Sequence, residues 1–322
     1  MSITSILSKE KGRNHLKDWF MTNFPNPNLQ NTVPIKIPSN NTNGNYASEI
    51  GGALDYLIRF HIEKINPKSI IKNKLIAQKS IELMYENYVD YYLDQPLTIK
   101  IIMLGEVTLP SVIEFTETLD IFVNAAEEVF SNYISGLSRI DDNLIELSLF
   151  YAKAEEFYRS KKIPENLFHT DEEQIKELKK IFKLCLKNKV IINKKFDYIL
   201  NPEFGNASKL VGGADADLIV NDMLIDIKTT KHFTLERKDL NQILSYYILS
   251  LIDNKETTIN YIGIYYARFD YLLKIKIEDY YSKDEFQILK KEFVELILDK
   301  EKQLSTTRIP KLIGKNMNKK KV

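Results

Sequence analysis

The chain has 322 residues, which at roughly 150 residues per domain corresponds to about two domains, or to one core with a large insertion. Its 45 Lys and Arg residues against 44 Asp and Glu give a formal net charge of +1. This balance excludes a protein that grips nucleic acid with a uniformly basic surface, although it allows a local basic groove. With 44% apolar residues, 11 Gly and 10 Pro, the chain can bury a large core and is neither collagen-like nor disordered.

The cysteine content and the length of the apolar runs indicate the cellular compartment in which the protein is expected. Cys185 is the single cysteine, which excludes an intrachain disulfide, a cysteine-rich zinc site and an iron–sulfur cluster. The apolar stretch at the N-terminus is too short for a signal peptide. The longest apolar run of the second half, residues 246–252, is far below the ~20 residues that span a bilayer. We therefore expect a cytoplasmic protein in a reducing environment, without a membrane segment.

Helical periodicity dominates the first 195 residues. Residues 1–45 are polar and rich in Asn and Pro, and they predict an irregular N-terminal arm with one short helix around Trp19. Residues 47–65 predict the first long helix, which Pro67 ends. Residues 69–195 are expected to be almost wholly helical. Three apolar stripes at helical spacing carry this prediction: Leu119, Phe122, Val123, Ala126, Phe130 and Tyr133; Leu144, Leu147, Tyr151, Ala154 and Tyr158; and Ile175, Leu178, Phe182 and Cys185.

The pattern changes after Lys195. Residues 217–220 and 223–228 predict a β-hairpin around a two-residue Asn-Asp turn, since both residue types tolerate the positive φ that such turns need. A helix is predicted at about 235–252, followed by strands at 259–267 and 271–277. A last amphipathic helix contains Phe286, Leu289, Phe293 and Leu296, and a basic, solvated tail follows it.

The two-residue turn fixes the register of the hairpin. It places Asp217 directly opposite Asp226, at a Cβ separation of about 4.5–5.5 Å, where like charges are destabilising. Lys228 and Asp215 lie two residues along their strands, so both share this face. The neighbours Leu218, Ile225 and Ile227 point to the other side.

Two interpretations of this polar face are open from the residues alone. Opposed carboxylates suit Mg²⁺ or Mn²⁺, and an ion held there could activate a water molecule and neutralise a phosphate, with Lys228 beside it. The alternative is a solvent-facing hairpin on which Asp and Lys alternate outward. The D-x-K spacing by itself does not separate the two interpretations.

Three motifs in chain order resemble those of a known family. The segments Gly-Gly-Ala-Asp215-Ala-Asp217-Leu-Ile-Val and Leu-Ile-Asp226-Ile-Lys228-Thr-Thr resemble motifs II and III of the PD-(D/E)XK nuclease superfamily, in its RecB-like branch. On the next predicted helix, Gln242-Ile-Leu-Ser-Tyr246 is similar to the Q-x-x-x-Y motif of that branch. The resemblance covers roughly residues 210–277.

The resemblance implies a fold and a set of site residues. It implies a restriction-endonuclease-like core, a mixed sheet flanked by helices, with Mg²⁺ or Mn²⁺ at the hairpin. Asp217 and Asp226 would be metal ligands and Lys228 the catalytic lysine, while Gln242 and Tyr246 would lie near the metal and the nucleic acid. Asp215 is a second choice for the ligand position, since the spacing from the glycines also fits it.

The upstream metal ligand is expected on the helix at 47–65. RecB-like nucleases often show G-T-x-x-H there, and Gly51-Gly52-Ala-Leu-Asp55 has the glycine and the spacing with Asp in place of His. Asp55 is therefore the first candidate. The alternative for Asp55 is a simple i,i+4 ion pair with Arg59. Glu49 is the next candidate ligand, with a helix-dipole role as its alternative.

These patterns together predict an α/β protein with a large helical insertion. The domain boundaries that we expect are an arm at 1–45, a nuclease core at 46–66 and 196–280, a helical insertion lobe at 67–195, and a C-terminal helix and basic tail at 281–322. The expected function is a Mg²⁺-dependent DNA nuclease, in DNA repair or phage defence if it follows its RecB-like relatives. The alternative is a nuclease-like module that binds nucleic acid or a partner without cutting.

The expected partners follow from the same motifs. DNA is the expected substrate, and the sequence does not exclude RNA. No G-x-x-x-x-G-K-[ST] motif occurs, so any helicase or translocase would be a separate chain. The lysines at 176–195 form either a nucleic-acid-facing helix or a solvated helix face.

Overall fold

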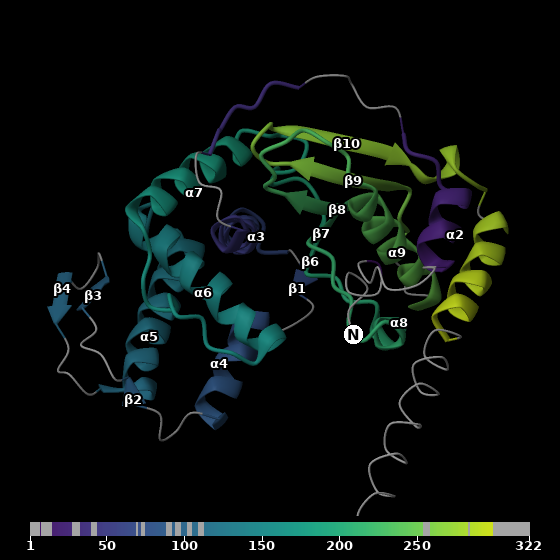
Figure 1. Ribbon diagram of the computed structural model, residues 1–322. Coiled ribbons are helices and arrows are strands. Elements are labelled where there is room, and N and C mark those ends of the chain that lie inside the picture. The colour runs from purple at the N-terminus through teal and green to yellow at the C-terminus, as the bar shows by residue number, and fades with distance from the viewer. Residues whose placement is uncertain are drawn as a thin grey trace, which may run out of the picture.

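The computed structural model describes residues 7, 15–27, 33–39, 44–68, 70–71, 75–87, 92–93, 98–101, 105–108, 113–253, 258–282 and 284–298. Within these residues a mixed six-stranded sheet lies between two groups of helices (Figure 1). The α/β class predicted from the sequence is therefore confirmed.

The sheet contains a three-stranded antiparallel unit and one parallel crossover. Strands β6, β7 and β8 follow one another antiparallel, and β9 then lies parallel to β8 because helix α9 connects them. β10 pairs antiparallel with β9, and the short β1 pairs parallel with β6 at the other edge. The bounds are β1 Ile70–Ile71, β6 Tyr198–Leu200, β7 Leu218–Val220, β8 Met223–Lys228, α9 Arg237–Asp253, β9 Tyr261–Tyr266 and β10 Tyr271–Lys276.

Both faces of the sheet are buried, and the period of two along each strand divides the side chains between two cores. On β7 and β8, Leu218, Val220 and Ile225 belong to a core with the long helices. Ile219 and Leu224 belong to a second core on the α9 side. The near-continuous apolar runs of these strands follow from this burial on both faces.

Five helices make the first layer. Their bounds are α3 Gly44–Ile65, α4 Ile76–Asn87, α5 Phe115–Ile134, α6 Asp142–Ser160 and α7 Glu172–Cys185. The apolar stripes read at 119–133, 144–158 and 175–185 coincide with α5, α6 and α7, and most of their members are buried. These helix predictions are confirmed.

Within residues 69–114, helix α4 agrees with the helical prediction, but the described residues between 92 and 114 do not. Short strands occur here: β2 Tyr92–Leu93, β3 Thr98–Ile101, β4 Gly105–Thr108 and β5 Ile113–Glu114, in two small antiparallel sheets. The segments Thr-Ile-Lys-Ile and Gly-Glu-Val-Thr are rich in β-branched residues, which favour strands over helices. The helical prediction for 69–195 therefore fails in this part.

The second layer packs on the opposite face of the sheet. It contains α9, α2 (His15–Asn23), the short α8 (Gly205–Leu210) and a helix at 284–298. The helix expected around Trp19 is thus present, and its Phe20 and the next residue after the helix, Phe24, are fully buried. Arg237 at the start of α9 donates hydrogen bonds to the carbonyl oxygens of Phe20 and Phe24, which fixes α2 against α9. The helical part of the N-terminal arm therefore belongs to the core.

The predicted domain boundaries cut across one continuous packing unit. The first core joins α3 and strands β6–β8 to α4–α7, so residues of the predicted nuclease core and of the predicted insertion share one interior. The boundaries at 46–66, 67–195 and 196–280 stay predictions, and residues 299–322 of the predicted tail lie outside the described residues. Among the helices described, none has both the length and the apolar character needed to cross a bilayer.

Candidate active site

The hairpin has the register that the sequence predicts. Val220 pairs with Met223, Ile219 with Leu224 and Leu218 with Ile225. Asn221 in the turn has a φ of 53°, the positive value expected there. Regular pairing ends at Leu218, so the next residues in register are Asp217 and Asp226.

Asp217 stands where β7 begins and continues the pairing with its side chain. Its Oδ2 accepts a hydrogen bond of 2.5 Å from the backbone N–H of Ile227. The backbone carbonyl of Asp217 accepts from the N–H of Asn201, which ties the residue to β6 as well. The carboxylate is therefore held by the backbone of β8, and the main chain of Asp217 is held by the residue that follows β6.

Asp226 and Lys228 form an ion pair on β8. Lys228 Nζ lies 2.9 Å from Asp226 Oδ2 and 3.6 Å from Oδ1 of Asp239, which projects from the first turn of α9. Asp226 is 3% exposed, and no donor among the described residues meets its Oδ2 with hydrogen-bond geometry. The lysine is thus clamped between two carboxylates, one of which the sequence prediction omitted.

Gln242 and Tyr246 continue this chain of contacts along α9. Lys228 Nζ donates to Gln242 Oε1 at 3.1 Å, and Gln242 Nε2 donates to the hydroxyl oxygen of Tyr246 at 2.8 Å. Residues four apart share one face of a helix, which explains the spacing of the motif. Because the tyrosine oxygen accepts here, its own O–H is available as a donor. The structure connects four of the predicted residues by direct polar contacts: Asp226, Lys228, Gln242 and Tyr246.

Helix α3 approaches the end of β8 closely at Gly51. A Cβ at this position would lie 3.2 Å from Thr229 Oγ1, so a larger residue would crowd the side chain of Thr229. Asp55 and Arg59 follow at i+4 and i+8 and therefore lie on the same face of α3. Arg59 Nη2 and Asp55 Oδ2 form an ion pair, while Asp55 Oδ1 and Arg59 Nε have no hydrogen-bond partner among the described residues.

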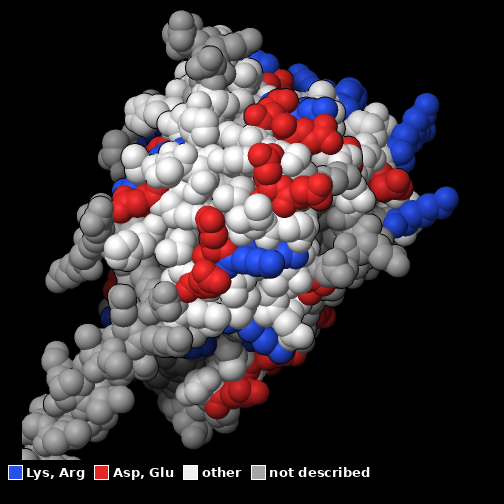
Figure 2. Space-filling model, turned by 90° about the vertical axis from the view of Figure 1, so that its right-hand side faces the viewer, with Lys and Arg blue, Asp and Glu red and all other residues white. Residues whose placement is uncertain are grey.

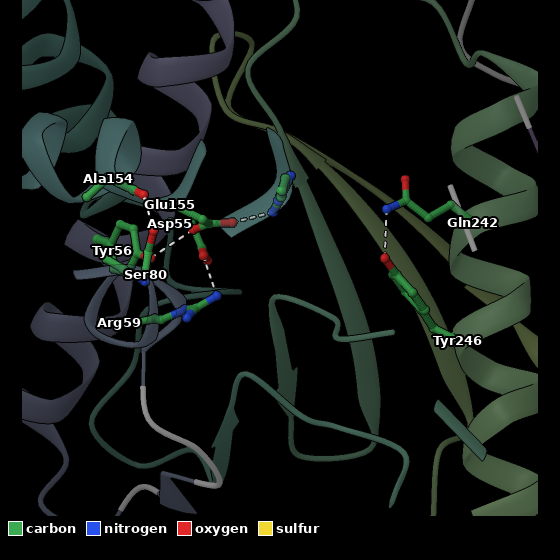
Figure 3. Close-up of polar contacts among 10 residues, drawn as sticks. Asp55, Tyr56, Arg59, Ser80, Ala154, Glu155, Gln242 and Tyr246 are labelled. Atoms are coloured by element: carbon green, nitrogen blue, oxygen red, sulfur yellow. Dashed lines mark hydrogen bonds and ion pairs between the residues drawn. The ribbon is translucent and has the colours of Figure 1, made fainter. Parts of the chain in front are cut away.

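Asp55 forms the i,i+4 ion pair that the sequence offered as one alternative, and its role as a metal ligand stays a prediction. It pairs with Arg59, and its carboxylate is also close enough to Asp217 and Asp215 to act on them electrostatically. Figure 3 shows Asp55 and Arg59 to one side of the hairpin strands, with Gln242 and Tyr246 on the other side.

Glu155 on α6 is a carboxylate that sequence reasoning missed. It accepts a hydrogen bond of 2.8 Å from the hydroxyl of Tyr56 and pairs with Arg159, and its charge acts on Asp55 and Asp215 (Figure 3). Gly52 allows this approach, because a Cβ there would lie 3.1 Å from the Cβ of Ala152. The Gly51-Gly52 pair could have signalled two close contacts, but nothing in the sequence pointed to α6 as the partner.

The two second-choice ligands lie in different places. Asp215 lies in the loop before β7, where its backbone forms an isolated antiparallel β-bridge with Glu203. Its side chain interacts electrostatically with Glu155 and Arg59, so it lies at the margin of the acidic cluster. Glu49 accepts hydrogen bonds from Asn166 (2.9 Å) and Gln174 (2.7 Å). It is six residues from Asp55, about 9 Å along α3 and about 240° around it, so the structure does not bring Glu49 to the hairpin.

The acids repel one another, and their proton affinities show it. Burial raises the pKa of Asp217 well above its usual range, and the charges of Asp55 and Asp226 raise it further. Burial likewise raises the pKa of Asp55 to about 6, although Arg59 opposes the rise. Burial alone would lower the pKa of Lys228, but Asp226 and Asp239 reverse the effect and hold the pKa above its ordinary value.

The donor chemistry of this cluster suits a hard divalent cation. Asp55, Asp217 and Asp226 offer carboxylate oxygens, and one buried oxygen of Asp55 and one of Asp226 lack a hydrogen-bond donor among the described residues. Within the same residues, no three acids, histidines or cysteines are already spaced as a set of ligands. Each of the three acids instead interacts with a protein group: Asp55 with Arg59, Asp226 with Lys228, and Asp217 with the N–H of Ile227.

Comparison with known proteins adds no assignment. No family model, curated protein or solved structure matches this chain. The functional argument therefore depends on the residues and their geometry.

Proposed function

We propose that this protein is a metal-dependent deoxyribonuclease with a PD-(D/E)XK core, which hydrolyses phosphodiester bonds with the help of Mg²⁺ or Mn²⁺. One observation carries the proposal: Lys228, between Asp226 and Asp239, is linked through Gln242 to Tyr246. A solvent-facing hairpin would have no need for these buried contacts. Asp226 is 3% exposed and Tyr246 is 5% exposed.

The order of elements supports the same proposal. The resemblance implies a core of one helix, three strands, a second helix and a further strand. Helix α3, the antiparallel strands β6–β8, helix α9 and the parallel strand β9 follow one another in this order. The acids lie at the end of the β7–β8 hairpin, and Asp55 approaches them from the first helix of this series. Gly51, part of the segment that resembles the first family motif, lies where α3 meets Thr229.

The side chains suggest how the reaction would proceed. A divalent ion held by Asp55, Asp217 and Asp226 would supply positive charge for the phosphate and would acidify a bound water. Lys228 keeps its proton beside Asp226 and places a fixed positive charge where negative charge develops on the phosphate oxygens. Gln242 orients the ammonium group through Oε1, and the O–H of Tyr246 can donate to the substrate.

The test is a cleavage assay with a panel of nucleic acids. Linear duplex, circular and single-stranded DNA and single-stranded RNA are incubated with Mg²⁺, with Mn²⁺ or with a chelator. We expect cleavage of at least one DNA with the metals and none with the chelator. Cleavage of RNA alone would change the substrate class. Binding without cleavage under every condition would favour the non-cleaving module.

A further inference from the structure

The lysines of α7 and the following loop form a separate charged feature. Residues 178–196 contain seven lysines and no Asp or Glu. Lys179 pairs with Asp142 at 2.6 Å. The other six are exposed, and no ion pair to an acid is found for them within the described part of the chain. We call these six the α7 basic surface: Lys180, Lys183, Lys187, Lys189, Lys194 and Lys195.

This concentration of positive charge is unusual for the chain, whose formal net charge is only +1. The opposite side of the molecule, with α2 and the 284–298 helix, shows acids interspersed with lysines (Figure 2). There, Lys276 pairs with Glu278 at 2.7 Å. A solubilising surface needs only such mixed charges, whereas an uncompensated positive surface attracts polyanions.

Buried contacts tie the α7 basic surface to the end of β8. Glu177 on the inner side of α7 pairs with Arg268, whose Nε donates to the carbonyl oxygen of Thr229 at 2.7 Å. Thr229 directly follows Lys228, and Arg268 is only 1% exposed. Beyond α7, Asn188 donates to Asp270 in the β9–β10 turn at 2.8 Å. Figure 1 shows β8 and β9 running toward α7. The lysines are therefore held in a fixed position relative to the candidate active site.

The candidate active site by itself has more carboxylates than cationic side chains. Six carboxylates, Asp55, Glu155, Asp215, Asp217, Asp226 and Asp239, interact there with three cations, Arg59, Arg159 and Lys228. A nuclease with such a site needs positive charge beside it to overcome the repulsion of the substrate. Lys180 and Lys183 lie on one face of α7, and Lys187, just beyond the end of the helix, extends this line to about 10 Å, the length of about three phosphates of one duplex strand.

We propose that the α7 basic surface is the docking surface for the phosphodiester backbone of the DNA substrate. This inference deepens the proposed nuclease function and rests on it for the identity of the ligand. The lysines act as point charges on phosphates, so they contribute affinity without sequence preference. The surface would hold the DNA while the hairpin acids and Lys228 meet the bond to be cut.

The test measures binding separately from cleavage. Fluorescence anisotropy follows the binding of labelled 30-nucleotide single-stranded and duplex DNA in Ca²⁺ at several NaCl concentrations. The variant carries Lys180→Gln, Lys183→Gln and Lys187→Gln. The control carries Lys274→Gln, Lys276→Gln and Lys291→Gln, three exposed lysines of β10 and the 284–298 helix, and so loses the same net charge. Circular dichroism and the melting temperature confirm that both are folded.

We expect the α7 variant to bind DNA roughly tenfold to a hundredfold more weakly at 100 mM NaCl, with the salt slope reduced by about 2–3 for duplex DNA. Its KM should rise while kcat stays within about threefold, and the control should match wild type. Equal losses in variant and control would overturn the proposal, since net charge alone would then explain binding.

If wild type cleaves DNA and the α7 variant binds and cleaves equally well, the surface proposal fails and the nuclease proposal stands. If the α7 variant loses binding but wild type never cleaves, the surface stands and the nuclease proposal fails. If wild type neither binds nor cleaves, both fail.

Discussion

Arg59→Met should destabilise the protein at neutral pH, because it leaves the carboxylate of Asp55 without its counter-ion. The side chains of this pair are 7% and 18% exposed, and removal of one partner of a buried ion pair costs about 3–5 kcal/mol. Protonation limits the loss, since a carboxyl group can take up a proton at about 1.4 kcal/mol per pH unit above its pKa. The pKa of Asp55 in wild type is already about 6, so relative to wild type this limit is about 1.4 kcal/mol at pH 7 and close to zero at pH 5.

The loss of folding stability in Arg59→Met should depend on pH. The variant should raise the pKa of Asp55 above the value of about 6 that it has beside Arg59. An acid with a raised pKa in the folded state binds more protons there than in the unfolded state, so folding stability falls as the pH rises. The deficit relative to wild type should therefore be largest at neutral pH and should shrink toward pH 5.

Arg159→Met is the matched control. Arg159 forms the same i,i+4 pair with Glu155, but its side chain is 70% exposed, so its loss should cost less than about 1 kcal/mol. Urea unfolding followed by circular dichroism at pH 5 and pH 7.5 measures all three proteins. Equal, small losses of unfolding free energy in both variants, without pH dependence, would refute the inference that Asp55 belongs to a buried charge cluster.

Three further predictions test other parts of the account. Asp217→Asn should stabilise the metal-free protein by about 1–2 kcal/mol at pH 7 in thermal unfolding, because an amide oxygen can still accept from Ile227 without adding to the buried charge. Mg²⁺ or Mn²⁺ should raise the melting temperature of wild type, by about 2.7 kcal/mol of stability at a hundredfold excess over Kd, and Asp217→Asn should blunt the rise; an equal rise would place the ion elsewhere. Burial lowers the pKa of His61 to about 4, so up to about 3 kcal/mol of stability should be present above pH 6.5 and lost as the pH falls toward 4; His61→Gln should remove this loss in acid unfolding.

The part of the site that the sequence predicted is the part built from local rules. A two-residue turn sets the hairpin register, and the spacing of four sets the common face of Gln242 and Tyr246, so Asp226, Lys228 and both α9 residues fall into place. Glu155 was missed because it reaches the cluster through the packing of α6 on α3, about 100 residues apart in the chain. Asp239 was missed because only the folded crossover brings the first turn of α9 to Lys228.

The same division holds for the fold. Long amphipathic helices such as α5 and α7 were predicted from their apolar stripes. The short strands β2–β5 were not, because segments of two to four residues show too few repeats to separate strand from helix. The burial of Phe20 and Phe24 could not be read from a polar, Pro-rich segment, since it depends on distant partners such as Phe286 and Phe293.

The most direct test of the central claim is single-turnover cleavage of the preferred DNA by Lys228→Gln in saturating Mg²⁺. Lys238→Gln is the control, because Lys238 lies nearby on α9 with a side chain that is 69% exposed and pairs with Glu236. The account predicts that Lys228→Gln binds DNA with nearly wild-type affinity and cleaves it at least about a hundredfold more slowly, the loss expected for one preorganised charge in an active site. Lys238→Gln should cleave at the wild-type rate. Wild-type cleavage by a folded Lys228→Gln would contradict the assignment of this hairpin as the catalytic centre.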